Sequence, residues 1–121
     1  MAFSVEKYLF DTFDLHNRNC WHFACDVWAD LTGLRLHSSI EDFHLSALQG
    51  YALKQSRCLR PIAAPCSPCL VLMQRERIQP HVGVYVGGKL LHLKESGAAY
   101  VDLQHVTALY PKVSFYTNPI P

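Results

Sequence analysis

The sequence predicts an α+β fold, in which N-terminal helices pack on an antiparallel sheet of about five strands. Two observations support this expectation. Apolar residues before position 50 follow helical spacing, whereas those after position 68 lie in short runs separated by turn residues. Helical and strand segments are also grouped and do not alternate, which disfavours a parallel sheet. We expect residues 1–121 to form a single domain, since this length can bury one hydrophobic core.

The first half of the chain predicts three helices. Residues 3–10 have helical spacing, and the polar residues 11–19 lead into a stronger segment at 20–31. Asn19 is a suitable N-cap for that segment and Gly33 a suitable C′ residue. A third helix is expected after Ser38 or Ser39, whereas residues 51–60 are ambiguous. The buried stripe of the 20–31 helix is expected to comprise Cys20, Phe23, Ala24, Val27, Trp28 and Leu31.

The second half predicts antiparallel strands. Prolines in residues 61–68 favour an irregular or extended connection. Short apolar or β-branched runs then predict strands at 69–74, 81–86, 89–93, 99–103 and 113–116.

Gly87-Gly88 predicts a two-residue turn, because such turns require positive φ angles. This turn would place His81 and Gly83 on one face, with His92 opposite Gly83 and diagonal to His81. Gly83 would leave room beside the two imidazoles. A three-residue turn would instead put the histidines on opposite faces.

Composition disfavours several classes of partner. The formal net charge is +1 and no basic stripe is present, so we expect no nucleic-acid partner. The apolar runs are too short for a membrane span. The first residues lack the pattern of a signal peptide, so we expect cytoplasmic synthesis.

The five cysteines are expected to be reduced thiols, because their number is odd and no export sequence is visible. The spacing Cys66-Ser67-Pro68-Cys69 leaves zinc binding and redox chemistry open as alternatives to structural thiols, with Cys58 as a further candidate zinc ligand.

The ordered residues Cys20, His81 and His92 predict cysteine-nucleophile chemistry without a metal or cofactor. A thiol at a helix N-terminus meets the positive end of the helix dipole, which favours thiolate. One imidazole can exchange a proton with that thiol, and a second can hold the first in one tautomer. The alternative is a small buried cysteine beside a structural histidine pair.

Two segments resemble the NlpC superfamily of papain-like cysteine peptidases and amidases. One is Asn19-Cys20-Trp21-His22-Phe23, at the start of an amphipathic helix. The other is His81-Val-Gly-Val-Tyr-Val-Gly-Gly-Lys-Leu-Leu-His92-Leu, which resembles the histidine-bearing hairpin of the family. Tyr8 also lies twelve residues before the cysteine, where members often have a tyrosine. The resemblance covers roughly residues 8–116 and implies a papain-like fold.

The resemblance implies a role for each matching residue. Cys20 would be the nucleophile, His81 the general base and acid, and His92 the residue that orients His81. Tyr8 would help to bind substrate or stabilise the oxyanion. Trp21, next to the nucleophile, and Gly83 are further candidate substrate contacts.

The implied function is hydrolysis of an amide in a peptidoglycan stem peptide, in an assembly such as a phage tail or at the cell wall. Delivery with a virion or to the periplasm would then follow synthesis. Two alternatives stay open: an inactive structural or assembly module of the same fold, and a thiol-dependent acyltransferase or thioesterase acting on lipid. The dipeptide Asn19-Cys20 also resembles the lecithin:retinol acyltransferase group.

Overall fold

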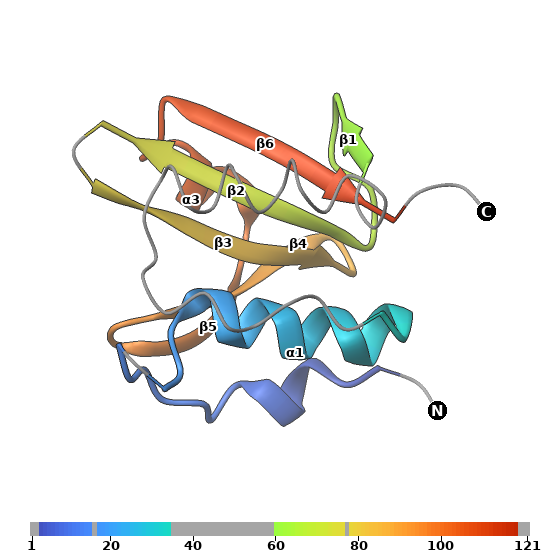
Figure 1. Cartoon of the computed structure of the whole chain (residues 1–121), viewed down its shortest axis with the longest axis vertical. Coiled ribbons are helices and arrows are strands. Elements are labelled where there is room, and N and C mark those ends of the chain that lie inside the picture. The colour runs from blue at the N-terminus through green and yellow to red at the C-terminus, as the bar shows by residue number, and fades with distance from the viewer. Residues whose placement is uncertain (1–2, 16, 35–59, 77, 119–121) are drawn as a thin grey trace.

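The protein has an α+β fold with an antiparallel sheet. The computed structural model describes residues 3–15, 17–34, 60–76 and 78–118. Within these ranges, six strands form one sheet in the order β1-β6-β2-β3-β4-β5. The N-terminal segment and helix α1 lie beneath the β3–β4 part of the sheet in Figure 1, and the short helix α3 packs on the other face.

The helices are η1, one turn of 3-10 helix at Val5–Tyr8, α1 at Cys20–Thr32 and α3 at Leu103–Thr107. The strands are β1 at Arg60–Ile62, β2 at Cys69–Arg75, β3 at Ile78–Val86, β4 at Lys89–Lys94, β5 at Gly97–Val101 and β6 at Lys112–Thr117.

All five expected strands are present, although β3 begins three residues earlier than expected and β5 two residues earlier. The sequence did not predict β1, a short edge strand that includes Pro61 and pairs with β6. The strand expected at 99–103 was wrong at its end, because β5 ends at Val101 and Leu103 begins α3. The helix expected after Ser38 or Ser39 falls outside the described residues.

Helix α1 begins and ends where the sequence predicts. The Asn19 side chain accepts hydrogen bonds from the backbone N–H groups of Trp21 and His22, while His22 Nδ1 accepts one from the Asn19 N–H. These reciprocal bonds form a capping box. At the other end Gly33 has φ 77°, the left-handed conformation that glycine adopts without strain.

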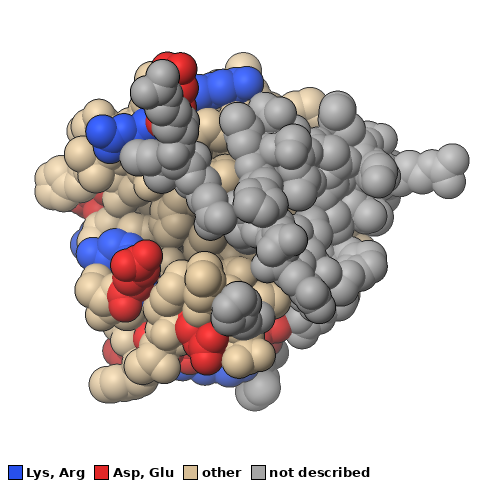
Figure 2. Space-filling view, turned by 60° about the vertical axis from the view of Figure 1, so that its left-hand side comes forward, with Lys and Arg blue, Asp and Glu red and all other residues tan. Residues whose placement is uncertain are grey.

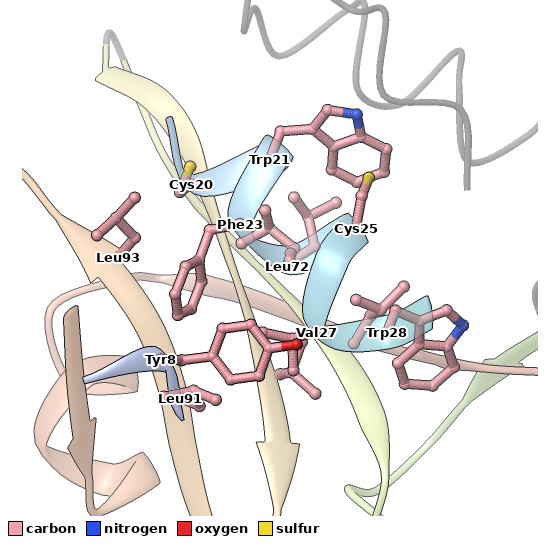
Figure 3. Close-up of a cluster of buried hydrophobic side chains, with 14 residues drawn as sticks. Tyr8, Cys20, Trp21, Phe23, Cys25, Val27, Trp28, Leu72, Leu91 and Leu93 are labelled. Atoms are coloured by element: carbon pink, nitrogen blue, oxygen red, sulfur yellow. The ribbon is translucent and has the colours of Figure 1, made fainter. Parts of the chain in front are cut away.

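Two apolar clusters lie on opposite faces of the sheet. One joins α1 and the N-terminal segment to β2, β3 and β4, and Figure 3 shows its central side chains. The other lies beneath α3 and contains the buried residues Cys69, Val71, Met73 and Leu90. Alternation along each strand therefore sends one set of side chains to each cluster.

The β3–β4 hairpin has the expected two-residue turn. Val86 pairs with Lys89, and Gly87 and Gly88 have φ angles of 65° and 89°. Away from the turn, the pairing of β3 with β4 ends at Val84 and Leu91.

Beyond that point the two strands pair only with their outer neighbours. β3 pairs with β2 through His81 and, after a bulge, at Ile78, and β4 pairs with β5 as far as Lys94. The β3–β4 ladder therefore ends near the start of α1, although the two strands are still in contact at Gly83 and His92. We call the region beyond the last pair of this ladder the β3–β4 gap.

No helix in the described part of the chain is long and apolar enough to cross a membrane.

Candidate functional site

Cys20, His81 and His92 line one cavity at the β3–β4 gap. It has a volume of about 490 Å³. Its walls come from the loop before α1, the ends of β3 and β4, and the segment around α3. The other lining residues are Phe13, Leu15, Asn19, Pro80, Leu93, Lys94, Glu95, Val101, His105, Val106, Leu109 and Tyr110.

Cys20 is the first residue of α1 and is buried. Figure 3 shows its sulfur pointing away from the rings of Phe23 and Tyr8. Burial raises the pKa of the thiol to about 11, while backbone hydrogen bonds from Val82, Cys20 itself and Trp21 act in the opposite direction. The Val82 bond brings the sulfur next to the residue that follows His81.

The two histidines form a direct hydrogen bond across the hairpin. His81 Nε2 lies 2.7 Å from His92 Nδ1, and the rings meet edge to face. One nitrogen must donate and the other accept, so the tautomers of the two rings are coupled. If His81 Nε2 donates, its Nδ1 is left as an acceptor that can take a proton. His92 Nε2 is buried and has no hydrogen-bond partner among the described residues.

Burial favours the neutral form of both imidazoles. Desolvation, together with the charge of Lys94, lowers the pKa of His81 to about 4. Desolvation, then His81 and Lys94, lower the pKa of His92 to about 3. At neutral pH the resting site therefore holds a neutral thiol beside two neutral imidazoles.

Tyr110 is a further site residue that the sequence analysis did not identify. Its ring lies nearly parallel to His81, at an interplanar angle of 13° and a centroid separation of 6.4 Å. Burial raises the pKa of Tyr110, and the nearby Cys20 adds to this effect. No local motif marks this tyrosine, because it reaches the site only through the turn that follows α3.

The three expected substrate contacts do not line the cavity. The Tyr8 hydroxyl donates a hydrogen bond to Asp30 Oδ2 at 2.5 Å, and Figure 3 shows it pointing away from Cys20. Trp21 is buried in the cluster around α1. Gly83 lies under His92, where a Cβ atom would come within 3.0 Å of the His92 Cβ. Gly83 therefore gives room to the histidine pair itself.

Of three further polar residues close to the site in sequence, one lines the cavity. His22 belongs to the α1 capping box and does not line the cavity. His105 is exposed and lines the cavity from α3. Asp102 is exposed and precedes α3.

The remaining expected candidates are cysteines outside the cavity. Cys66 is exposed and Cys69 buried, and both are free thiols near the start of β2. Cys58 falls outside the described residues.

Among the described residues, no group of three or more histidine, cysteine or acidic side chains is arranged to hold a metal ion. No family model and no curated protein matches this chain.

Proposed function

We propose that this protein is a cysteine-dependent hydrolase that cleaves an amide bond, with Cys20 as nucleophile, His81 as general base and acid, and His92 as the residue that orients His81. The observation behind the proposal is the 2.7 Å bond between His81 Nε2 and His92 Nδ1 in the cavity that Cys20 lines. A thiol, a base and an orienting group within one cavity are the components that nucleophilic acyl transfer requires. Their combination also supports a papain-like interpretation of the fold.

The proposed reaction has two steps. Cys20 Sγ attacks the carbonyl carbon while its proton passes to His81, and the C–S bond forms. His81 then gives that proton to the amide nitrogen, the C–N bond breaks and the amine leaves. Water next attacks the thioester carbonyl while His81 takes its proton, the C–S bond breaks, and His81 returns the proton to Cys20 Sγ. The products are a carboxylic acid and the free Cys20 thiol.

Backbone amide groups are suitable donors for the oxyanion in this scheme. The bonds that the backbones of Val82 and Cys20 make to the thiol support this role. They would stabilise negative charge on a bound carbonyl oxygen as the tetrahedral intermediate forms. Tyr8, engaged with Asp30, need not take part.

The substrate class follows from the NlpC resemblance, which favours a peptide stem of peptidoglycan. The partner would then be a cell-wall fragment, and the protein would act with a phage tail or another cell-wall assembly. An inactive structural module and a lipid-directed thiol acyltransferase are the competing functions.

Purified wild type and the Cys20→Ser variant test the reaction with stem-peptide fragments, followed by mass spectrometry of the products. We expect cleavage by the wild type and at least a hundredfold loss in the variant, because a serine hydroxyl is a far weaker nucleophile than a thiol near neutral pH. Cys66→Ser, which changes an exposed thiol outside the cavity, is the matched control. Equal rates in wild type and Cys20→Ser would refute the assignment.

The competing functions give different products. A folded wild type inert towards every stem peptide and acyl substrate favours the structural module. Release of fatty acid from a phospholipid or long-chain thioester favours the lipid-directed enzyme. A thiol-directed probe that labels Cys20 before the exposed Cys66 would show that the buried thiol is activated, despite its lower exposure.

The pH dependence of kcat/KM gives an independent check. With pKa values of about 4 for His81 and about 11 for Cys20, activity should rise through the lower value and stay level across neutral pH. An alkaline limb near pH 8 would indicate a thiolate–imidazolium pair at rest and would contradict the neutral resting site.

A further inference from the structure

Apolar side chains are the largest group among the described residues that line the cavity around Cys20. Among these described lining residues, Lys94 and Glu95 are the only lysine, arginine or acidic ones. These two residues are adjacent and carry opposite charges. A ligand with a carboxylate or an ammonium group would therefore gain no net electrostatic attraction from them. The apolar lining consists of Phe13, Leu15, Pro80, Leu93, Val101, Val106 and Leu109.

Two leucines in this lining are exposed to solvent. Leu15 is 52% exposed and Leu109 is 63% exposed, and they come from the loop before α1 and the turn after α3. A single exposed leucine is ordinary on a protein surface. Here two from distant segments meet at the cavity that holds the nucleophile. Figure 2 shows a recess with uncharged and charged described side chains beside it.

We propose that this cavity binds an apolar acyl group, either an aliphatic or aromatic amino-acid side chain or a short fatty acyl chain, next to the carbonyl that Cys20 attacks. The inference rests on the proposed function and specifies its substrate. The acyl portion is the part assigned to the cavity because it stays bonded to Cys20 Sγ in the thioester. Apolar walls are the usual lining of sites that take such groups.

Binding can be measured without turnover in the Cys20→Ala variant. The probes are N-acetyl-leucinamide, N-acetyl-glutamic acid amide and hexanamide, titrated while NMR shifts of backbone amides are followed. We expect the leucine or the hexanoyl probe to bind at least tenfold more tightly than the glutamic acid probe, with shifts at Leu109 and Val106. Tighter binding of the leucine probe would indicate that the cavity takes an amino-acid side chain. Tighter binding of hexanamide would indicate that it takes a fatty acyl chain. Equal binding of the acidic probe, or shifts elsewhere only, would overturn the proposal.

Turnover gives a second measurement. With 4-nitroanilides of acetyl, butyryl and hexanoyl groups, kcat/KM should rise with length, by up to about fourfold per methylene if each becomes fully buried. Leu109→Ser should flatten this dependence. Leu9→Ser is the matched control, because Leu9 is 38% exposed and does not line the cavity.

The two proposals fail separately. A flat length dependence with Cys20-dependent activity overturns the acyl preference and leaves the hydrolase. Selective binding of an apolar probe by a wild type that turns nothing over refutes the hydrolase and supports the cavity's preference.

Discussion

Acid should destabilise this protein through its buried histidine pair. His81 and His92 stay neutral in the folded state because burial lowers their pKa values to about 4 and about 3. In the unfolded chain both have the ordinary pKa of about 6.5 and take up protons as the pH falls. A folded-state pKa below the unfolded one means that stability is present above pH 6.5 and is lost as the pH falls towards 4.

The magnitude follows from the difference in bound protons. Between pH 7 and pH 5, protonation stabilises the unfolded chain by about 2 kcal/mol for each histidine that stays neutral in the folded state. The pair should therefore lower the free energy of unfolding by about 4 kcal/mol over this interval. Typical domains have only about 5–15 kcal/mol in total, so the loss is large.

Urea denaturation at pH 7 and pH 5, followed by the fluorescence of the buried Trp21 and Trp28, measures this loss. In His92→Gln the loss should be smaller by about 2 kcal/mol, since one histidine is gone. His105→Gln, at an exposed position, is the control and His81→Gln the reciprocal variant. Comparing one variant at two pH values cancels the direct effect of the substitution on packing. An equal loss in His92→Gln and wild type would refute the reasoning.

Three further variants test the surroundings of the site. Gly83→Ala should lower the free energy of unfolding by about 1–3 kcal/mol and reduce kcat/KM, because the new alanine Cβ would press on the His92 Cβ. Unchanged urea denaturation and unchanged activity would argue against this packing. Tyr8→Phe should lose about 1 kcal/mol of stability, because it removes the hydrogen bond to Asp30, but should keep wild-type kcat/KM. A loss of activity would instead assign the hydroxyl a role in the reaction. Tyr110→Phe should keep kcat/KM within about twofold and Tyr110→Ala should lose about fivefold, as expected for stacking worth about 1 kcal/mol. Equal losses in the two variants would instead implicate the hydroxyl.

Local chemistry allowed much of the fold to be predicted. Asn19 and Gly33 set the ends of α1 because a side-chain acceptor and a positive φ are needed at those points. Gly87-Gly88 set the turn, and the turn fixed which residues share a face with His81. The proximity of the two imidazoles follows from register alone, since they lie eleven residues apart on one hairpin.

The remaining features depend on contacts between distant segments. Tyr8 was expected at the nucleophile, but its hydroxyl bonds to Asp30, twenty-two residues away on α1. Tyr110 reaches His81 only after the chain has passed through β5 and α3. The short strand β1 contains Pro61 and depends on pairing with β6, so its own residues do not predict it. The family resemblance remains a prediction.

The β3–β4 gap makes part of the candidate site independent of side-chain identity. The amide of Val82 bonds to the sulfur at a point beyond the last pair of the β3–β4 ladder, and every amino acid except proline has such an amide. Substitution at position 82 can change packing but leaves the donor in place. A deletion or insertion in β3 would instead move a different amide to the sulfur and turn the histidine to the opposite face. Related chains can therefore diverge widely in residue type around this contact, provided that the length of the hairpin is preserved.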